Sequence, residues 1–86
     1  MLNALVVIPT YNEIENIERL LRNVFSLGMN FHALVVDDNS PDGTGQVVES
    51  LFEKYPDQLF LLKRNEKAGL GTAYIAGFKW ALERDY

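Results

Sequence analysis

The chain has 86 residues, no cysteine, and a formal net charge of -4 with an isoelectric point near 4.8. This length can bury one small core at most, and a composition of 48% hydrophobic and 23% charged residues is typical of a folded globular domain. The acidic balance argues against nucleic-acid binding, and the lack of cysteine excludes disulfides and thiolate metal sites, which fits a reducing compartment.

The first predicted strand, Leu5 to Ile8, is apolar on both faces, which is typical of a buried strand in a parallel sheet. This apolar run is too short for a signal sequence or a membrane span, and Pro9 ends it. Asn12 is predicted to cap a helix, with Glu15 completing a capping box. Apolar positions at spacings of three and four predict that this helix continues to about Gly28.

A second predicted strand, Ala33 to Val36, leads directly into the adjacent aspartates Asp37 and Asp38. The turn-forming cluster NSPDGT follows and is predicted to return the chain into a helix. The apolar face of that helix runs from Val47 to Tyr55, and Pro56 ends it. The two carboxylates are therefore expected at the carboxyl end of a strand.

The third predicted strand, Leu59 to Lys63, is followed by a polar connection and by the clearest helix of the sequence, Leu70 to Leu82. This alternation predicts an α/β fold in three layers, a parallel sheet with helices on its faces. Three strands leave two open sheet edges, which predicts self-association through an edge. Because the chain closes on a helix with no further strand, we expect residues 1–86 to be the amino-terminal part of a nucleotide-binding domain, truncated at Tyr86.

Ligands of open parallel sheets bind beyond the carboxyl ends of the strands, where the loops PTYNE, DDNSPDGT and KRNEKAGLGT should meet. Tyr11 can stack on a base, Glu13 can accept from a sugar or base, and one of Asp37 and Asp38 should face the ligand because side chains alternate along a strand. Each residue also has a structural explanation: Tyr11 packs on its own loop, Glu13 favours the helix amino terminus, and the aspartates cap the turn.

The third loop adds two glycines and three cations to the region beyond the carboxyl ends of the strands. Gly69 and Gly71 allow the backbone to approach a sugar or phosphate, or simply precede a helix. Lys63, Arg64 and Lys67 can attract phosphates, but at least two of them are better explained as a solvated charged loop. A dinucleotide GxGxxG motif and a P-loop are both absent, and one histidine without cysteine excludes Ser-His-Asp, Cys-His and zinc constellations.

In this order, the segments VVIPTYNEIENI, LVVDDNSPDGT and KAGLGTAYIAGF resemble the amino-terminal region of dolichol-phosphate mannose synthases and related polyprenol-phosphate glycosyltransferases of inverting family 2. The resemblance covers essentially the whole chain. It implies a GT-A, Rossmann-like fold and transfer of mannose from GDP-mannose, or less often glucose from UDP-glucose, to a dolichyl or polyprenyl phosphate. It also implies a location at the cytoplasmic face of a membrane.

The same resemblance assigns the nucleotide-sugar site to one set of residues: Pro9, Tyr11, Glu13, Val36 and Asp38, with their neighbour Asp37. It implies a Mg2+ or Mn2+ cofactor held by an Asp-x-Asp motif, which we expect beyond Tyr86, so no metal ligand or catalytic residue is assigned and the fragment is expected to be inactive. The alternative is a non-catalytic receiver-like or flavodoxin-like module. Receiver-like folds carry acids after the first strand and a phosphoacceptor after the third, where this chain has Pro9 and Lys63.

Overall fold

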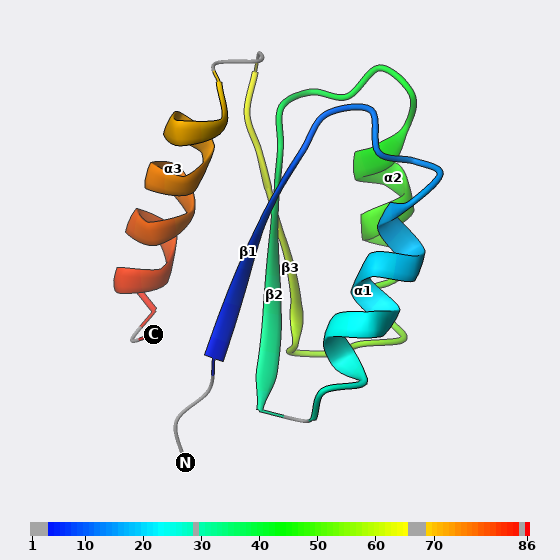
Figure 1. Cartoon of the computed structure of the whole chain (residues 1–86), viewed down its shortest axis with the longest axis vertical. Helices are drawn as coiled ribbons and strands as arrows, with labels where there is room; N and C mark the ends of the chain where they lie inside the picture. Colours follow the sequence, from blue (N-terminus) through cyan, green and yellow to red (C-terminus); the bar gives the residue numbers. More distant parts are fainter. Residues whose placement is uncertain (1–3, 29, 66–68, 85) are drawn as a thin grey trace.

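A computed structural model of the chain describes residues 4–28, 30–65, 69–84 and 86. Strands and helices alternate through it, as predicted (Figure 1). The elements are β1 (Ala4–Thr10), α1 (Ile17–Phe25), β2 (Phe31–Asp37), α2 (Thr44–Ser50), β3 (Leu59–Lys63) and α3 (Leu70–Leu82). The predicted strands and the third helix are confirmed, and the first two helices are shorter than predicted.

The three strands form one parallel sheet with β2 in the middle. In its register Val35 lies beside Ile8 on one side and beside Leu61 on the other. Because all three strands run in the same direction, their carboxyl ends lie together at one end of the sheet, at the top of Figure 1. The loops that follow β1 and β2 lie at this carboxyl end.

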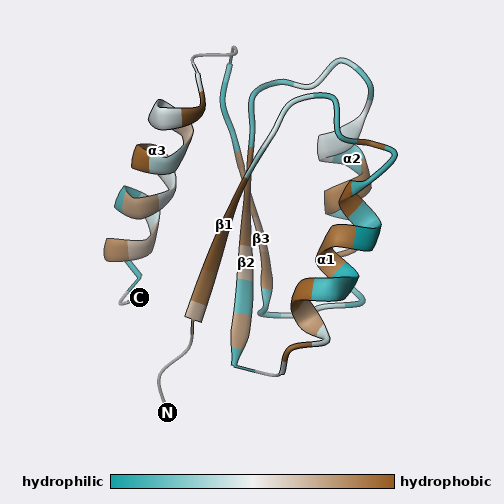
Figure 2. Cartoon of the chain, in the orientation of Figure 1, coloured by the Kyte–Doolittle hydropathy of each residue, from teal (hydrophilic) through white to brown (hydrophobic). Residues whose placement is uncertain are grey.

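Helices cover both faces of the sheet, α1 and α2 on one side and α3 on the other (Figure 1). Successive strand side chains point to opposite faces, so the apolar strands, brown in Figure 2, supply two separate cores. The larger core consists of Ile8, Ile17, Leu21, Val24, Ala33, Val35, Val48, Leu51 and Leu59, and the smaller of Leu34, Val36 and Ala73. The three-layer α/β prediction is confirmed.

Helix α3 lies on the face of the sheet opposite to α1 and α2. After β3 the chain returns across the opposite face, where α3 packs on β1 and β2. Gly77 permits this packing, because a Cβ at this position would come within 2.5 Å of Val7 Cγ1. Open α/β sheets bind ligands beyond the carboxyl ends of their strands, and the first turn of α3 lies next to this end of β1 and β2.

The start of α1 differs from the prediction. Asn12 adopts a left-handed conformation with φ of 57° and lies in the loop, so it does not cap a helix, and Glu15 completes no capping box. The helix begins at Ile17 instead, and the side chain of Asn16, at the N-cap position, makes no capping hydrogen bond. Tertiary bonds to the second loop, described below, hold this segment and override the local capping pattern.

The second helix also ends earlier than predicted. Regular α2 stops at Ser50, and the chain continues to Tyr55 through turns in which Leu51 N donates to Val48 O at 3.0 Å and Phe52 N to Glu49 O at 3.2 Å. The apolar spacing from Val47 to Tyr55 is thus satisfied by tighter turns. The predicted apolar face of this segment is still buried, since Leu51 belongs to the larger core.

Candidate nucleotide-binding site

Hydrogen bonds join the loops after β1 and β2 at the carboxyl end of the sheet. Three successive amides of the first loop donate to side chains of the second. The bonds run from Asn12 N to Ser40 Oγ (2.9 Å), from Glu13 N to Thr44 Oγ1 (3.0 Å) and from Ile14 N to Asp42 Oδ2 (3.1 Å). The NSPDGT cluster therefore orders the neighbouring loop besides turning the chain.

Asp42 also binds the first residue of α2. Its Oδ1 accepts from the amide of Thr44 at 2.9 Å and from the Thr44 hydroxyl. Desolvation raises the pKa of Asp42, but hydrogen bonds from the Thr44 hydroxyl and from the Ile14 and Thr44 amides outweigh this effect and leave the pKa below its usual value. The ionised carboxylate is the form that these donors favour.

Asp37 is buried and links β1 to the second loop. It accepts from Thr10 Oγ1 at 2.7 Å, from the Ser40 amide at 3.0 Å and from Ser40 Oγ at 2.6 Å. These three donors satisfy the Asp37 carboxylate within the protein. Its role in the structure is thus to hold the carboxyl ends of β1 and β2 in place.

Asp38 points elsewhere and pairs with Arg64. The guanidinium donates from Nε to Oδ1 at 2.6 Å and from Nη2 to Oδ2 at 2.8 Å, which is a bidentate pair. The pKa of Arg64 is raised by this hydrogen bond to Asp38. The prediction that the adjacent aspartates serve different tasks is confirmed, because their side chains bind different partners.

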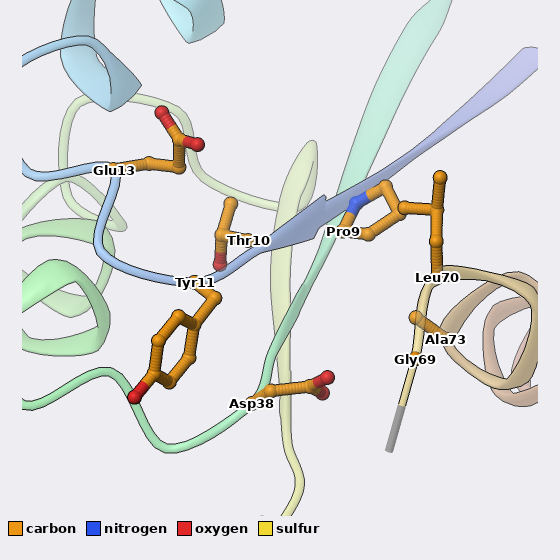
Figure 3. Close-up of a pocket in the computed structure, with 8 residues that line it drawn as sticks. All are labelled: Pro9, Thr10, Tyr11, Glu13, Asp38, Gly69, Leu70 and Ala73. Carbon is orange, nitrogen blue, oxygen red and sulfur yellow. The ribbon is translucent and has the colours of Figure 1, made fainter. Parts of the chain in front are cut away.

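A cavity of about 260 Å³ opens beside Asp38, between the ends of β1 and β2 and the first turn of α3 (Figure 3). Its lining residues are Pro9, Thr10, Tyr11, Glu13, Asp38, Gly69, Leu70 and Ala73. The volume is close to the lower end of the range for small-molecule sites, roughly 300–1,000 Å³. In Figure 3 the carboxylate of Asp38 extends toward the α3 side of the cavity.

The structure brings four of the six sequence-predicted residues to this cavity, namely Pro9, Tyr11, Glu13 and Asp38. Asp37 lies outside the lining. Val36 is fully buried between the sheet and α3, so its side chain does not reach the cavity, although its backbone lies beside Pro9 in the register. The three loops predicted to meet do so, since Gly69 completes the far side.

Sequence reasoning missed part of the lining and the partner of Asp38. Thr10, Leu70 and Ala73 line the cavity. The sequence places Thr10 and Leu70 in loops expected to meet here without assigning them to the site, and it predicts Ala73 only as a helix position. The sequence gives Arg64 only as one of three cations that can attract phosphates, at least two of which are better explained as a solvated loop. The register pairs Asp37 with Lys63, and extending that pairing by one residue places Asp38 beside Arg64. This register is known from the structure, and the sequence pattern does not contain it.

Gly69 has both conformational and positional reasons to be glycine. Its φ of 95° and ψ of 155° belong to a region that other residues rarely adopt, and its carbonyl accepts from Thr72 Oγ1 at 2.9 Å. A Cβ there would meet nothing within 4 Å, so backbone conformation, not space, is the constraint. The glycine lets the chain enter α3 at the edge of the cavity.

Within residues 4–28, 30–65, 69–84 and 86, no group of three or more histidine, cysteine or acidic side chains could hold a metal ion. These residues do not fit a divalent-cation site, and we assign no metal ligand among them. No helix in the described part of the chain combines the length and apolar character needed to cross a bilayer.

Comparisons with known proteins point to one family. The family model for glycosyl transferase family 2 matches residues 5–85. A polyprenol monophosphomannose synthase of Mycolicibacterium smegmatis is 50% identical over 96% of this chain and 31% of its own length. An undecaprenyl-phosphate mannosyltransferase of Micrococcus luteus is 46% identical over 99% of this chain and 35% of its own length. A dolichol-phosphate mannosyltransferase of Pyrococcus furiosus is 44% identical over 88% of this chain and 22% of its own length.

Among solved structures, a mannosyltransferase of Pyrobaculum calidifontis in complex with GDP-Man and Mn2+ superimposes with a TM-score of 0.83 at 32% identity. The match covers 92% of this chain and 24% of that protein. This chain therefore spans about a third or less of the length of the relatives that it matches.

Proposed function

The chain belongs to glycosyl transferase family 2, and from this premise we propose that residues 1–86 are the amino-terminal, nucleotide-binding part of an enzyme that transfers mannose from GDP-mannose to a polyprenyl or dolichyl phosphate. Its fold is the amino-terminal part of the GT-A fold. Relatives 44–50% identical are named for mannosyl transfer to such lipids or for polyprenol phosphomannose synthesis, which supports the proposal.

The cavity at the carboxyl ends of β1 and β2 is the observation that carries the proposal. It combines the aromatic ring of Tyr11 with the carboxylates of Glu13 and Asp38. A ring can stack on a base, and carboxylates accept hydrogen bonds from ribose hydroxyls or base N–H groups. Two carboxylates would repel a diphosphate, so this cavity suits the nucleoside end of a sugar nucleotide.

The proposed reaction forms one bond and breaks another at the anomeric carbon. An oxygen of the acceptor phosphate attacks that carbon, the bond to the diphosphate oxygen breaks with inversion, and GDP leaves. The second pKa of a phosphate monoester is about 6, so the acceptor is mostly ionised at neutral pH and needs no strong base. We assign none of the described residues to this step.

Further parts of the proposal concern the whole enzyme. We propose that it requires Mg2+ or Mn2+, as the Mn2+ in the similar mannosyltransferase structure suggests, and that it acts at the cytoplasmic face of a membrane. UDP-glucose is the second donor to test. The 86-residue chain by itself is proposed to lack transferase activity and to self-associate through a sheet edge.

Strand order argues against the receiver-like or flavodoxin-like alternative. Such folds have the order 2-1-3-4-5, in which the first strand lies between the second and the third. In this chain β1 lies at one edge of the described sheet and β2 lies in the middle. The order instead matches one half of a doubly wound nucleotide-binding sheet, and the cavity lies at the carboxyl ends of its strands.

Titration of GDP, UDP and guanosine into the chain, with and without Mn2+, tests the proposal. We expect GDP to bind more tightly than UDP, and guanosine to compete with GDP because the cavity holds the nucleoside. Replacing Asp38 with Asn should weaken binding, whereas Asp57→Asn, at an exposed turn before β3, should not. Absence of binding by GDP and by UDP would overturn the proposal.

A further inference from the structure

We propose that Arg64 is a positioning residue of the nucleoside site, which holds the carboxylate of Asp38 ionised and in one orientation for the donors of the ligand. This inference rests on the proposed function and deepens it. Arg64 is absent from the cavity lining, whereas Asp38 belongs to it. Arg64 would therefore act on the ligand through Asp38.

The geometry of the pair supports an orienting role. Two parallel bonds, Nε to Oδ1 at 2.6 Å and Nη2 to Oδ2 at 2.8 Å, fix both oxygens of Asp38 at once. The main-chain amide of Arg64 donates to Asp37 O at 2.8 Å, so the base of the arginine is tied to β2 as well. A carboxylate oxygen accepts more than one hydrogen bond, so the fork is compatible with a ligand donor on the same group. A lysine ammonium has no planar fork and would leave the carboxylate free to rotate.

Burial increases the importance of the charge of Arg64 at this position. The side chains of Asp38 and Arg64 are only 8% and 17% exposed, and a carboxylate so far from water is driven toward its neutral form unless a cation faces it. Of the described lining residues, the other charged side chain is that of Glu13, an acid, and the described first turn of α3 carries no charge. Asp37 lies on the same strand and binds Thr10 and Ser40. Among the described residues, Arg64 thus places a positive charge directly against an acid of the cavity lining.

Arg64 also connects the two walls of the cavity. Its Nη1 donates to Thr72 Oγ1 at 3.1 Å and its Nη2 lies 3.4 Å from Gly69 O, while Thr72 Oγ1 donates to the same carbonyl. Gly69 lines the α3 side of the cavity and Asp38 the β2 side. One guanidinium therefore sets the distance between the aspartate and the start of α3.

The test compares Arg64→Met and Arg64→Lys with the control Arg22→Met, which removes an exposed ion pair on α1. Affinity for GDP is measured between pH 4.5 and 8, and the protonation of Asp38 is followed separately by carbon NMR of its carboxyl group without nucleotide. We expect Arg64→Met to weaken GDP binding about tenfold or more and to raise the pH at which Asp38 takes up its proton by about one unit or more. Arg64→Lys should largely restore the protonation midpoint but not the affinity, because charge returns without the fork. The control should change neither.

The two readouts separate this inference from the proposed function. If the unmodified chain binds no GDP, the proposed function fails, and the Asp38 titration still decides the role of Arg64. If Arg64→Met binds GDP with unchanged affinity and pH dependence, or leaves the protonation of Asp38 unchanged, the inference is wrong. Amide NMR spectra confirm folding, and if Arg64→Met does not fold, Arg64→Lys and Thr72→Val supply the comparison: unchanged GDP affinity in both would overturn the inference.

Discussion

Gly77 of α3 lies so close to Val7 of β1 that a Cβ added to the glycine would be 2.5 Å from Val7 Cγ1 and 3.3 Å from Cγ2. Real Cβ contacts are not this short, so the Val7 side chain or one of the two elements must shift if the position carries a side chain. The approach allows α3 to cover the β1 side of the sheet, and α3 forms one wall of the candidate site.

Gly77→Ala should therefore destabilise the fold. Overpacking of this kind costs about 1–3 kcal/mol, which equals or exceeds the gain of about 1 kcal/mol that alanine brings to a helix interior. Gly71→Ala is the control in the same helix, because a Cβ at Gly71 meets nothing within 4 Å. That variant should be stabilised by up to about 1 kcal/mol. Urea unfolding of both variants gives the comparison, and equal stability gains would contradict the predicted clash.

Asp37→Asn should lower stability without acting on the cavity directly. The amide that replaces one oxygen would face donors from Thr10 or Ser40, so at least one buried hydrogen bond is lost, at a cost of about 1–3 kcal/mol. Asp57→Asn, at an exposed position, should stay within about 0.5 kcal/mol of the unmodified chain. Thermal unfolding of the two variants checks this, and identical midpoints would show that Asp37 is not needed to hold β1 and β2.

The elements and the loops of the site were predictable from sequence, but the partners of the loop residues were not. Apolar spacing in Ile17 to Val24 reports which side of a helix is buried, and this pattern is local. The start of α1 depends instead on a bond from the Asn12 amide to Ser40, 28 residues away, which no local capping pattern contains. Arg64 poses the same difficulty, because its pairing with Asp38 depends on the register of β2 and β3.

Tyr11 should contribute stacking to nucleoside binding. Its side chain is 37% exposed and lines the cavity. Tyr11→Ala should weaken guanosine binding by about 1–3 kcal/mol, the usual value of stacking on an aromatic ring, and Tyr11→Phe should keep most of the affinity. Tyr74→Ala is the control, since Tyr74 is similarly exposed at 38% but does not line the cavity. Equal affinity of Tyr11→Ala and the unmodified chain would exclude stacking by this ring.

Acid should weaken the contact between the loops after β1 and β2 through Asp42. Hydrogen bonds from Thr44 and Ile14 lower the pKa of Asp42 in the folded chain, so the folded state binds its proton less readily than the unfolded state does. The stabilisation is fully present above the unfolded pKa of about 3.9 and is lost as the pH falls through the lower folded value. The stability difference between the unmodified chain and Asp42→Asn should shrink as the pH falls from 5 to 2. Urea unfolding across this range checks it, and a constant difference would contradict the assignment.

The 86-residue chain should self-associate through the open edge of β1. In the described sheet β1 pairs with β2 alone, and an apolar groove of about 340 Å³ runs beside it. The groove is lined by Leu5, Val7, Phe78, Ala81, Leu82 and Tyr86. Phe78 is 58% exposed and Leu82 is 74% exposed, so pairing at this edge would bury apolar surface as well as backbone groups.

Light scattering at increasing concentration measures this association. A charge on the groove opposes burial, so Phe78→Glu and Leu82→Glu should move the chain toward the monomer. Leu27→Glu is the control, because Leu27 is 64% exposed but lies in the turn after α1, outside the groove. If the unmodified chain stays monomeric at every concentration, the edge of β1 does not drive association. If Leu27→Glu dissociates the oligomer as strongly as Phe78→Glu, the contact lies on a different surface.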